Sequence, residues 1–307
     1  NLTTKNFQSF YDMADPLETF GVSGAVTVNV LAGQNEFVLT SNLQLDAIFG
    51  ASATNTITIN GNGNHISNSG ARVINMNGAD YVTFDNLKIE NTGTNSATRV
   101  FWVHNSTDGL TISNCELIVS SASGSGSGSA YVFFSGSSTG RSSGNHGRNY
   151  NILNNTMWGG SASATSGVYY GIIDYRSSSY YGSAINANIQ NNQVMHWRYS
   201  GTYFYYTNTV TFKHNTLSDN QYSSGYVYGF YMYRANGVQH IDSNTIEDNE
   251  NNGFYHYGMY LYYADATSGV STATGNVVQN NDNGYYYIYG FYGRYLDNWD
   301  ITGNRFS

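Results

Sequence analysis

One short pattern of apolar and polar positions recurs along most of the chain. It consists of an apolar residue, any two residues, usually an Asn, any one residue and a second apolar residue, as in Ile152–Met157. Other copies begin at Ile112, Ile189, Phe212, Ile241, Ala273 and Ile301, and a copy with Leu in the Asn position begins at Phe84. The fourth position falls at residues 87, 115, 155, 192, 215, 244, 276 and 304, which gives an interval near 28 with several longer steps. A repeat of this length indicates a solenoid.

A repeat of about 28 residues built from short apolar runs predicts three short strands per coil, joined by loops of variable length. A single coil cannot bury its apolar face, so the coils must stack to form a core. Equivalent strands would then lie about 4.8 Å apart with their residues in register. The sequence therefore predicts an all-β parallel β-helix, a β-solenoid of about nine coils.

The N-terminal part differs from the repeats. Apolar residues between Phe7 and Phe20 recur near helical spacing, and a strand pattern follows at Val26–Val30. Because the first coil of a solenoid is unpaired, a short helix is expected to cover it. We expect residues 1–50 to form this helical cap and the first strands, and residues 51–307 to form one continuous β-helix domain. The chain stops one residue after a repeat, so we expect it to be part of a larger protein.

The recurring Asn residues predict a structural ladder. Asn is a poor strand former but tolerates left-handed bends between strands, and each stacked side-chain amide can bond the next coil. The predicted ladder consists of Asn155, Asn192, Asn215, Asn244, Asn276 and Asn304. Cys115 occupies the same column, where we interpret it as a small buried substitute and not a nucleophile.

Tyrosine is concentrated in the second half, with 25 of the 29 residues between Tyr169 and Tyr295. Alternation assigns Phe204, Met232 and Leu261 to the core, so the intervening tyrosines face outward. In-register stacking predicts one row of Tyr203, Tyr231, Tyr260 and Tyr292, and a second of Tyr175, Tyr205, Tyr233 and Tyr262 that ends at Arg294.

Such rows have two interpretations. Stacked rings stabilise a sheet, whereas a large exposed aromatic face is typical of an interaction surface. A polysaccharide would suit the rows, because sugars stack on aromatic ring faces and bond hydroxyls. Self-association of two flat faces is a further hypothesis, and ice binding is less well supported because Thr-rich rows would be expected.

Composition limits the classes of partner. Only 10% of the residues are charged, with 12 Lys and Arg and a net charge of -8, which argues against nucleic acid. No apolar run is long enough to cross a membrane. The single Cys cannot form an internal disulfide bond.

Two segments carry a family resemblance. Phe20–Gly33 and Ala51–Gly61 resemble the opening of large secreted β-helix proteins of Bacteroidota, and the Asn-rich coils resemble the right-handed β-helix repeat of pectate-lyase-like proteins. The resemblance covers most of the chain and implies a right-handed parallel β-helix that is secreted or displayed on a bacterial surface. It leaves activity open, because such proteins include lyases and adhesins.

An enzyme is the main alternative, since polysaccharide lyases and hydrolases use this fold. A lyase needs a base, often Lys or Arg, but Lys88 and Lys213 lie at non-core positions. A glycosidase needs two nearby carboxylates, and Asp174, Asp265 and Asp297 form no compact pair in the sequence.

The chain also holds one local acidic cluster, near His240. Its members are Asp242, Glu247, Asp248 and Glu250. It is interpreted as a solvated surface, with calcium binding as the alternative. We predict no catalytic residues, no metal site and no cofactor, apart from that calcium alternative.

The sequence thus favours a non-catalytic extracellular β-solenoid. Its outward tyrosines and Arg294 would mediate adhesion or polysaccharide binding. A carbohydrate-active enzyme and a structural or self-associating spacer are the alternatives.

Overall fold

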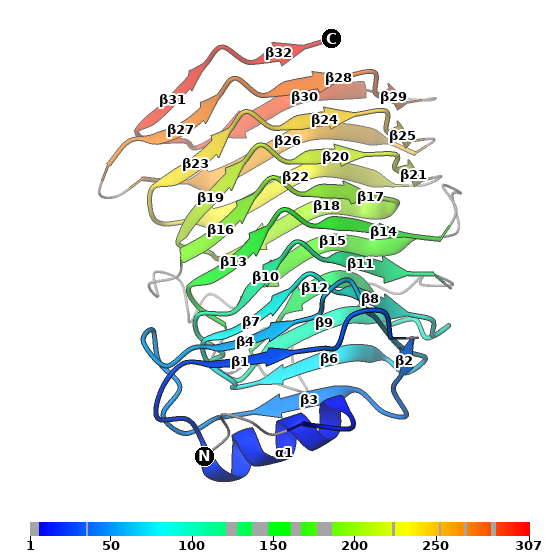
Figure 1. Ribbon diagram of the computed structural model, residues 1–307. Coiled ribbons are helices and arrows are strands. Elements are labelled where there is room, and N and C mark those ends of the chain that lie inside the picture. The colour runs from blue at the N-terminus through cyan, green and yellow to red at the C-terminus, as the bar shows by residue number, and fades with distance from the viewer. Residues whose placement is uncertain are drawn as a thin grey trace.

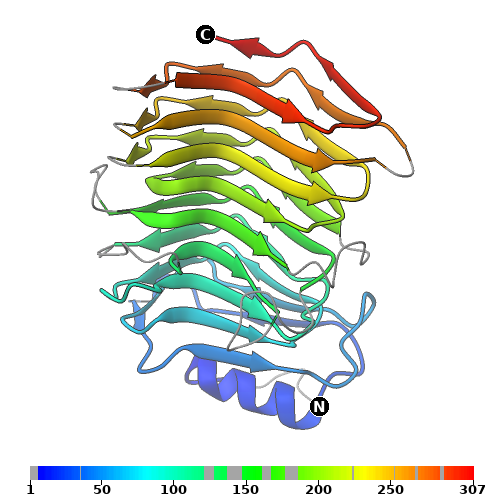
Figure 2. The same ribbon diagram turned by 180° about the vertical axis from the view of Figure 1, so that it is seen from behind.

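Three long parallel sheets run side by side along one axis in the computed structural model, which describes residues 6–34, 36–120, 128–136, 147–160, 167–176, 186–222, 225–251, 253–266, 269–283 and 287–307 (Figure 1). We call them sheets A, B and C, with ten, ten and nine strands. The chain visits sheets A, B and C in turn, so each complete coil adds one strand to each sheet. The N-terminus and the C-terminus lie at opposite ends of the stack (Figures 1 and 2).

The strands have the following bounds. Sheet A comprises β1 (Val26–Asn29), β4 (Ile57–Asn60), β7 (Val82–Asp85), β10 (Thr111–Ser113), β13 (Tyr150–Leu153), β16 (Asn186–Gln190), β19 (Thr209–Lys213), β23 (Gln239–Asp242), β27 (Ser271–Thr274) and β31 (Trp299–Thr302). Sheet B comprises β2 (Phe37–Val38), β5 (His65–Asn68), β8 (Lys88–Asn91), β11 (Glu116–Val119), β14 (Thr156–Gly159), β17 (Gln193–Met195), β20 (Thr216–Ser218), β24 (Thr245–Glu247), β28 (Val277–Gln279) and β32 (Arg305–Phe306). Sheet C comprises β3 (Leu43–Asp46), β6 (Arg72–Asn77), β9 (Arg99–His104), β12 (Ala130–Phe134), β15 (Val168–Tyr175), β18 (Trp197–Tyr205), β22 (Tyr226–Ala235), β26 (Tyr255–Ala264) and β30 (Tyr287–Arg294). A small fourth sheet pairs β21 (Gln221–Tyr222), β25 (Glu250–Asn251) and β29 (Asp282–Asn283).

A helix, α1 (Phe10–Phe20), covers the first coil beneath β3 (Figure 1). Its N-cap is Ser9, whose hydroxyl accepts a hydrogen bond from the Asp12 backbone amide at 3.1 Å, and its C-cap is Gly21 with φ of 66°. The helix buries Met13 and Leu17 against the core. The predicted helical cap is therefore confirmed.

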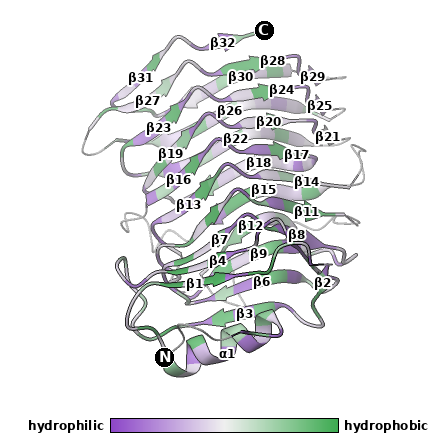
Figure 3. Ribbon diagram, viewed as in Figure 1, coloured by the Kyte–Doolittle hydropathy of each residue, from purple (hydrophilic) through white to green (hydrophobic). Residues whose placement is uncertain are grey.

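The core follows from alternation within each short strand. In β4 the buried Ile57 and Ile59 alternate with the half-buried Thr58 and Asn60. Parallel register then stacks like on like, as in the sheet B column of Ile89, Leu117, Met157, Val194 and Leu217. Figure 3 shows hydrophobic and hydrophilic residues alternating along the strands. The inward residues of the three sheets form one continuous apolar cluster, and the predicted all-β parallel solenoid is confirmed. The right-handed coiling of this solenoid stays a prediction.

The predicted asparagine ladder lies at the corner between sheets A and B. The Asn192 amide donates to Asn215 Oδ1 at 2.9 Å and to the Ile152 carbonyl at 2.8 Å, and its own Oδ1 accepts from Asn155. The same bonds recur up to Asn304, with every inner member almost completely buried. The Cys115 amide donates to Asn155 Oδ1 at 2.9 Å, so this thiol occupies the ladder column as predicted.

One part of the ladder prediction was wrong. The left-handed bend falls on the residue before each ladder position, as at Asn154, Asn191 and His214, where φ is 58°, 57° and 56°. The ladder Asn is selected for its amide bonds, while its predecessor makes the turn. A second, unpredicted ladder uses the same device after sheet B: Asn220 and Asn249 follow left-handed Asp219 and Asp248, and Asn249 donates to Asn281 at 2.9 Å.

Candidate functional site

The outward side of sheet C carries the two predicted tyrosine rows. Register pairs Tyr203 with Tyr231, then Tyr260 and then Tyr292. The second row runs from Tyr175 to Tyr262 and ends at Arg294, as predicted. Tyr231, Tyr260 and Tyr292 are half-buried and lie outside the main core cluster. Sheet C, seen from outside in Figure 2, therefore holds the candidate site.

Additional tyrosines extend these rows. Tyr228, Tyr257 and Tyr289 form a third stacked row, with ring centroids 5.2 and 5.0 Å apart. A fourth row consists of Tyr226, Tyr255 and Tyr287. We call the outward tyrosines of β15, β18, β22, β26 and β30, together with Tyr206, Arg234, Tyr263, Arg294 and Tyr295, the tyrosine face.

A column of glycines explains why the sequence pattern missed these two rows. Gly229 lies between Val227–Tyr228 and Phe230–Tyr231, where it shifts the alternation by one residue. A Cβ atom at Gly229 would lie 2.6 Å from the Gly258 carbonyl oxygen, and Gly201 and Gly258 are equally confined by the next coil. Only glycine fits this close approach. The signal was available, because a Tyr precedes each of Gly229, Gly258 and Gly290.

Ring geometry corrects the expected mode of sugar binding. Tyr231 stacks on Tyr203 at 4.4 Å with an interplanar angle of 2°, and on Tyr260 at 5.1 Å and 1°. Both faces of this ring are therefore covered by its neighbours, so sugars cannot stack on it. A ligand can reach only the rim of such a ring, which carries the hydroxyl group.

Rings of adjacent rows pack edge to face. Tyr257 meets Tyr260 edge to face at 5.2 Å and 82°, and Tyr228 meets Tyr231 at 4.9 Å and 77°. Along one strand, by contrast, the Tyr260 and Tyr262 rings are nearly parallel, 6.0 Å apart. Both offset-stacked and edge-to-face ring pairs are favourable, so the packed rings, called the stacked lattice below, hold their hydroxyl groups in a fixed two-dimensional pattern.

Tyr203 differs from the rest of its row. It was expected to face solvent, but its exposed fraction is only 8%. It packs in a separate outer cluster with Trp102, Phe133 and Ile173, and Tyr170 lies against its ring at 5.2 Å. Trp102, Phe133, Tyr170 and Tyr203 of the lower coils are thus buried, whereas the outward tyrosines of β22, β26 and β30 are partly exposed except for Tyr228, which is 8% exposed.

Crowding keeps the phenols protonated. Burial, with added repulsion from neighbouring phenolates, raises the pKa of Tyr257 and of Tyr260 to about 12. The same causes raise the pKa of Tyr203, Tyr228 and Tyr231 above its ordinary value. The hydroxyl groups of Tyr257 and Tyr260 have no protein hydrogen bond among the described residues. They are neutral donors and acceptors open to solvent or a ligand.

The turn after sheet C carries an unusual column. Tyr206, Arg234, Tyr263 and Tyr295 all adopt left-handed conformations, with φ between 53° and 59°. Earlier coils place Gly78 and Asn105 at this position, which are the residue types that adopt it easily. The Tyr263 ring stacks on Tyr295 at 4.5 Å, and Arg234 donates to the Tyr206 hydroxyl at 3.0 Å.

Of the carboxylates considered for catalysis, Asp174 lies in the core, whereas Asp265 and Asp297 follow the ends of β26 and β30. Asp174 points into the core, fully buried, where it accepts from Arg176 at 2.7 Å and from the Tyr150 hydroxyl at 2.9 Å. Burial, followed by the Asp174 charge, raises the pKa of Tyr150. Burial and then Asp297 raise the pKa of Asp265, which follows the end of β26.

The acidic cluster near His240 is spread over strands and turns. Asp242 lies 3.1 Å from Lys213 Nζ and accepts the hydroxyls of Thr272 and Thr274. Glu247 accepts from Gln279 at 2.8 Å. Across the described ranges, no group of three His, Cys, Asp or Glu side chains could hold a metal ion. These four residue types thus form no cluster of calcium ligands in the described part of the chain, and the calcium alternative stays a prediction.

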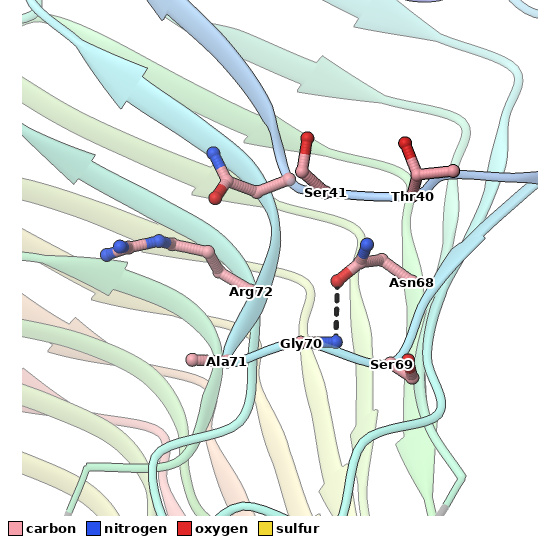
Figure 4. Close-up of a pocket in the computed structure, with 8 residues that line it drawn as sticks. Thr40, Ser41, Asn68, Ser69, Gly70, Ala71 and Arg72 are labelled. Carbon is pink, nitrogen blue, oxygen red and sulfur yellow. Dashed lines mark hydrogen bonds between the residues drawn. The ribbon is translucent and has the colours of Figure 1, made fainter.

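An open pocket of about 330 Å³ lies where sheet B meets sheet C in the early coils, lined by residues 40–42 and 68–72 (Figure 4). Asn68 Oδ1 accepts the Gly70 amide at 2.6 Å and fixes the turn. The Arg72 side chain extends away from this turn, and its guanidinium lies 4.0 Å from the ring centroid of Trp102. The pocket therefore adjoins the outward side of sheet C.

Comparisons with known proteins give a limited result. No protein-family model matches the chain, and no curated protein matches its sequence. Among solved structures, the chain is similar to the GH136 lacto-N-biosidase from Eubacterium ramulus, as a selenomethionine derivative (12% identity, TM-score 0.49) and as the native protein (10% identity, TM-score 0.47). Each match covers 98% of this chain and 64% of the lacto-N-biosidase chain, so this chain spans less than two thirds of that protein.

No helix in the described part of the chain has the length and apolar character that crossing a membrane requires.

Proposed function

We propose that this chain is a non-catalytic, extracellular binding module whose tyrosine face holds an extended polysaccharide or another repeating surface. Contact is made through phenol hydroxyl groups. Stacked neighbours cover the faces of the inner rings, while the rims of Tyr231, Tyr260 and Tyr262 remain partly accessible. A rigid pattern of donors loses little entropy on binding, which favours affinity for a repeating partner.

The turn column is the observation that carries this proposal. A bulky residue in the left-handed region costs about 1–3 kcal/mol, and four coils in succession accept that cost. Gly78 and Asn105 show that the same turn can be made with less strain. Stability alone therefore does not explain Tyr206, Arg234, Tyr263 and Tyr295, whereas a selected outer surface does.

Removal of hydroxyl groups without loss of the rings tests the proposal. The variant Tyr233→Phe/Tyr260→Phe/Tyr262→Phe/Tyr292→Phe keeps the stacked lattice, and Tyr11→Phe/Tyr81→Phe is a control away from the face. Both proteins and the parent would be tested on a glycan array and against insoluble polysaccharides, with folding checked by circular dichroism. We expect the parent and the control to bind and the fourfold variant to lose at least tenfold in affinity.

Three results would contradict the proposal. If the fourfold variant bound as well as the parent, the hydroxyl groups would have no role in binding. If the parent bound nothing and instead formed dimers in sedimentation experiments, the face would be a self-association surface. Release of sugar products by the parent would instead favour the carbohydrate-active enzyme.

A further inference from the structure

Charge is distributed unevenly over the three sheets. The whole chain has a net charge of -8, yet from β6 to β30 the strands of sheet C contain one carboxylate, Asp174, which is buried in the core. The same strands carry Arg72, Arg99, Arg198, Arg234 and Arg294. Asp265 and Asp297 lie just beyond the ends of β26 and β30. From β6 to β30 the outward surface of sheet C is thus positive on an acidic protein.

Three arginines of sheet C have different partners from Lys213 and Arg148, which lie outside this sheet. Outside sheet C, Lys213 lies 3.1 Å from Asp242 and Arg148 lies 3.8 Å from Asp108. Within the described ranges, Arg72, Arg234 and Arg294 form no ion pair with a carboxylate. Their charges are therefore not neutralised by the protein.

Aromatic rings hold these guanidinium groups instead. Arg234 lies 5.4 Å from the ring centroids of Tyr206, Tyr233 and Tyr263, and Arg294 lies 4.8 Å from that of Tyr295. Arg234 also hydrogen-bonds Tyr206 and Tyr233, and Arg294 hydrogen-bonds Tyr295 and Tyr292. A guanidinium has five N–H donors, so most of them remain available. Stacking fixes the position of the cation and leaves its edge for an anion.

We propose that the ligand of the tyrosine face is an acidic polysaccharide, bearing carboxylate or sulfate groups. Planar guanidinium groups bind such anions in a bidentate manner, and the neutral phenols between them bond the sugar hydroxyls. Arg234 and Arg294 lie two strands apart, about 10 Å along the axis, and Arg72 lies five strands from Arg234, about 24 Å. This spread fits a long chain with repeated charges better than a single small anion. The inference rests on the proposed function and specifies its ligand.

Single-stranded nucleic acid is also anionic, but it fits the face less well. Proteins bind its bases by stacking them on exposed aromatic rings. Rings such as Tyr231 and Tyr260 have a neighbouring ring on each face, which leaves no room for a base. The observations therefore favour the polysaccharide.

The test uses polymers that differ only in charge. Binding of the parent would be measured by biolayer interferometry to dextran and dextran sulfate, and to polygalacturonate and its methyl ester. The variant Arg234→Gln/Arg294→Gln removes two unpaired cations from the face. Arg148→Gln/Lys213→Gln is the control with the same change in net charge, made at cations that face carboxylates. A single-stranded polythymidine is the competing ligand.

We expect the parent to bind at least one acidic polymer at least tenfold more tightly than its neutral counterpart. The face variant should lose at least tenfold in affinity and show a weaker dependence on salt, while the control variant should bind like the parent. Preference for sulfate or for carboxylate would identify the group and uphold the proposal in either case.

The outcomes that overturn the inference are separable from failure of the proposed function. Equal binding to dextran and dextran sulfate, lost in the fourfold Phe variant, would refute the acidic ligand and retain the binding face. No binding to any polymer would refute both. Tighter binding to polythymidine than to every polysaccharide would replace the inference with a nucleic-acid site. An equal loss of affinity in the face variant and in the control variant would show a nonspecific charge effect.

Discussion

The asparagine ladder and the tyrosine face both repeat once per coil, but they use their polar atoms in different ways. Asn192 is 2% exposed, and its amide bonds carbonyl groups of its own coil and of a neighbouring one as well as the next ladder amide. The hydroxyl of Tyr260 has no such protein partner among the described residues, although its ring is packed on both faces. In the asparagine ladder the polar atoms stabilise the fold. In the tyrosine face the rings stabilise it, and the polar atoms remain available.

The largest effect is expected in the asparagine ladder. The substitution Asn215→Ala removes the acceptor of both the Asn192 backbone amide and its side chain, and leaves Asn244 without one donor. Loss of buried partners should lower the free energy of unfolding by about 3 kcal/mol. Urea denaturation followed by circular dichroism would measure it.

Asn188→Ala is the matched control, because this Asn bonds Asn151 on the half-exposed outside of sheet A. Its cost should stay below about 1 kcal/mol. Equal losses for the two variants would show that burial does not distinguish the ladder from surface asparagines.

A smaller effect is expected when a ring is removed from the tyrosine face. Tyr260→Ala deletes stacked contacts with Tyr231 and Tyr292 and should lower the free energy of unfolding by about 2 kcal/mol. Tyr260→Phe keeps both contacts and should change stability by less than about 0.5 kcal/mol. Urea denaturation of the two variants would compare ring with hydroxyl, and a Phe variant as unstable as the Ala variant would refute the division of roles.

The smallest change in stability is expected when the pH is first raised into the alkaline range. Because the folded pKa of Tyr257 and Tyr260 is raised to about 12, the unfolded chain loses protons first, at its ordinary value of about 10. The tyrosine contribution to stability is therefore constant below about pH 10 and falls as the pH rises toward about 12.

Denaturation midpoints measured from about pH 8 to about pH 11 would test this dependence, with tyrosinate absorbance recorded on the folded protein. The asparagine ladder does not titrate, so the parent and a double Tyr257→Phe/Tyr260→Phe variant should differ only at the alkaline end. Identical curves for the two proteins would contradict the raised pKa values.

Features with a strict period could be predicted from the sequence. Alternation placed Phe204 and Met232 in the core, and the repeat aligned Asn192 with Asn215 and Tyr231 with Tyr260. These predictions need only the fact that strands place successive side chains on opposite faces. They succeeded because each coil repeats the same local choice.

Other features depend on how coils meet and could not be predicted locally. The phase shift at Gly229 arises from the carbonyl of the next coil, and the burial of Tyr203 arises from Tyr170 and its outer neighbours. The orientation of the rings depends on side-chain torsions that the pattern does not specify. The sequence therefore located the candidate face but misjudged which part of each ring a ligand could reach.

The register of sheet C also means that the length of the tyrosine rows is set by the number of coils. The coils that contain β22 and β26 each contribute one member to every tyrosine row, and each coil contacts only the coils before and after it. Insertion of one more coil between β22 and β26 would lengthen the rows by about 4.8 Å without any change to the existing contacts within coils. The reach of the surface is thus set by the number of repeats, so that duplication or loss of a coil would adjust it in uniform steps.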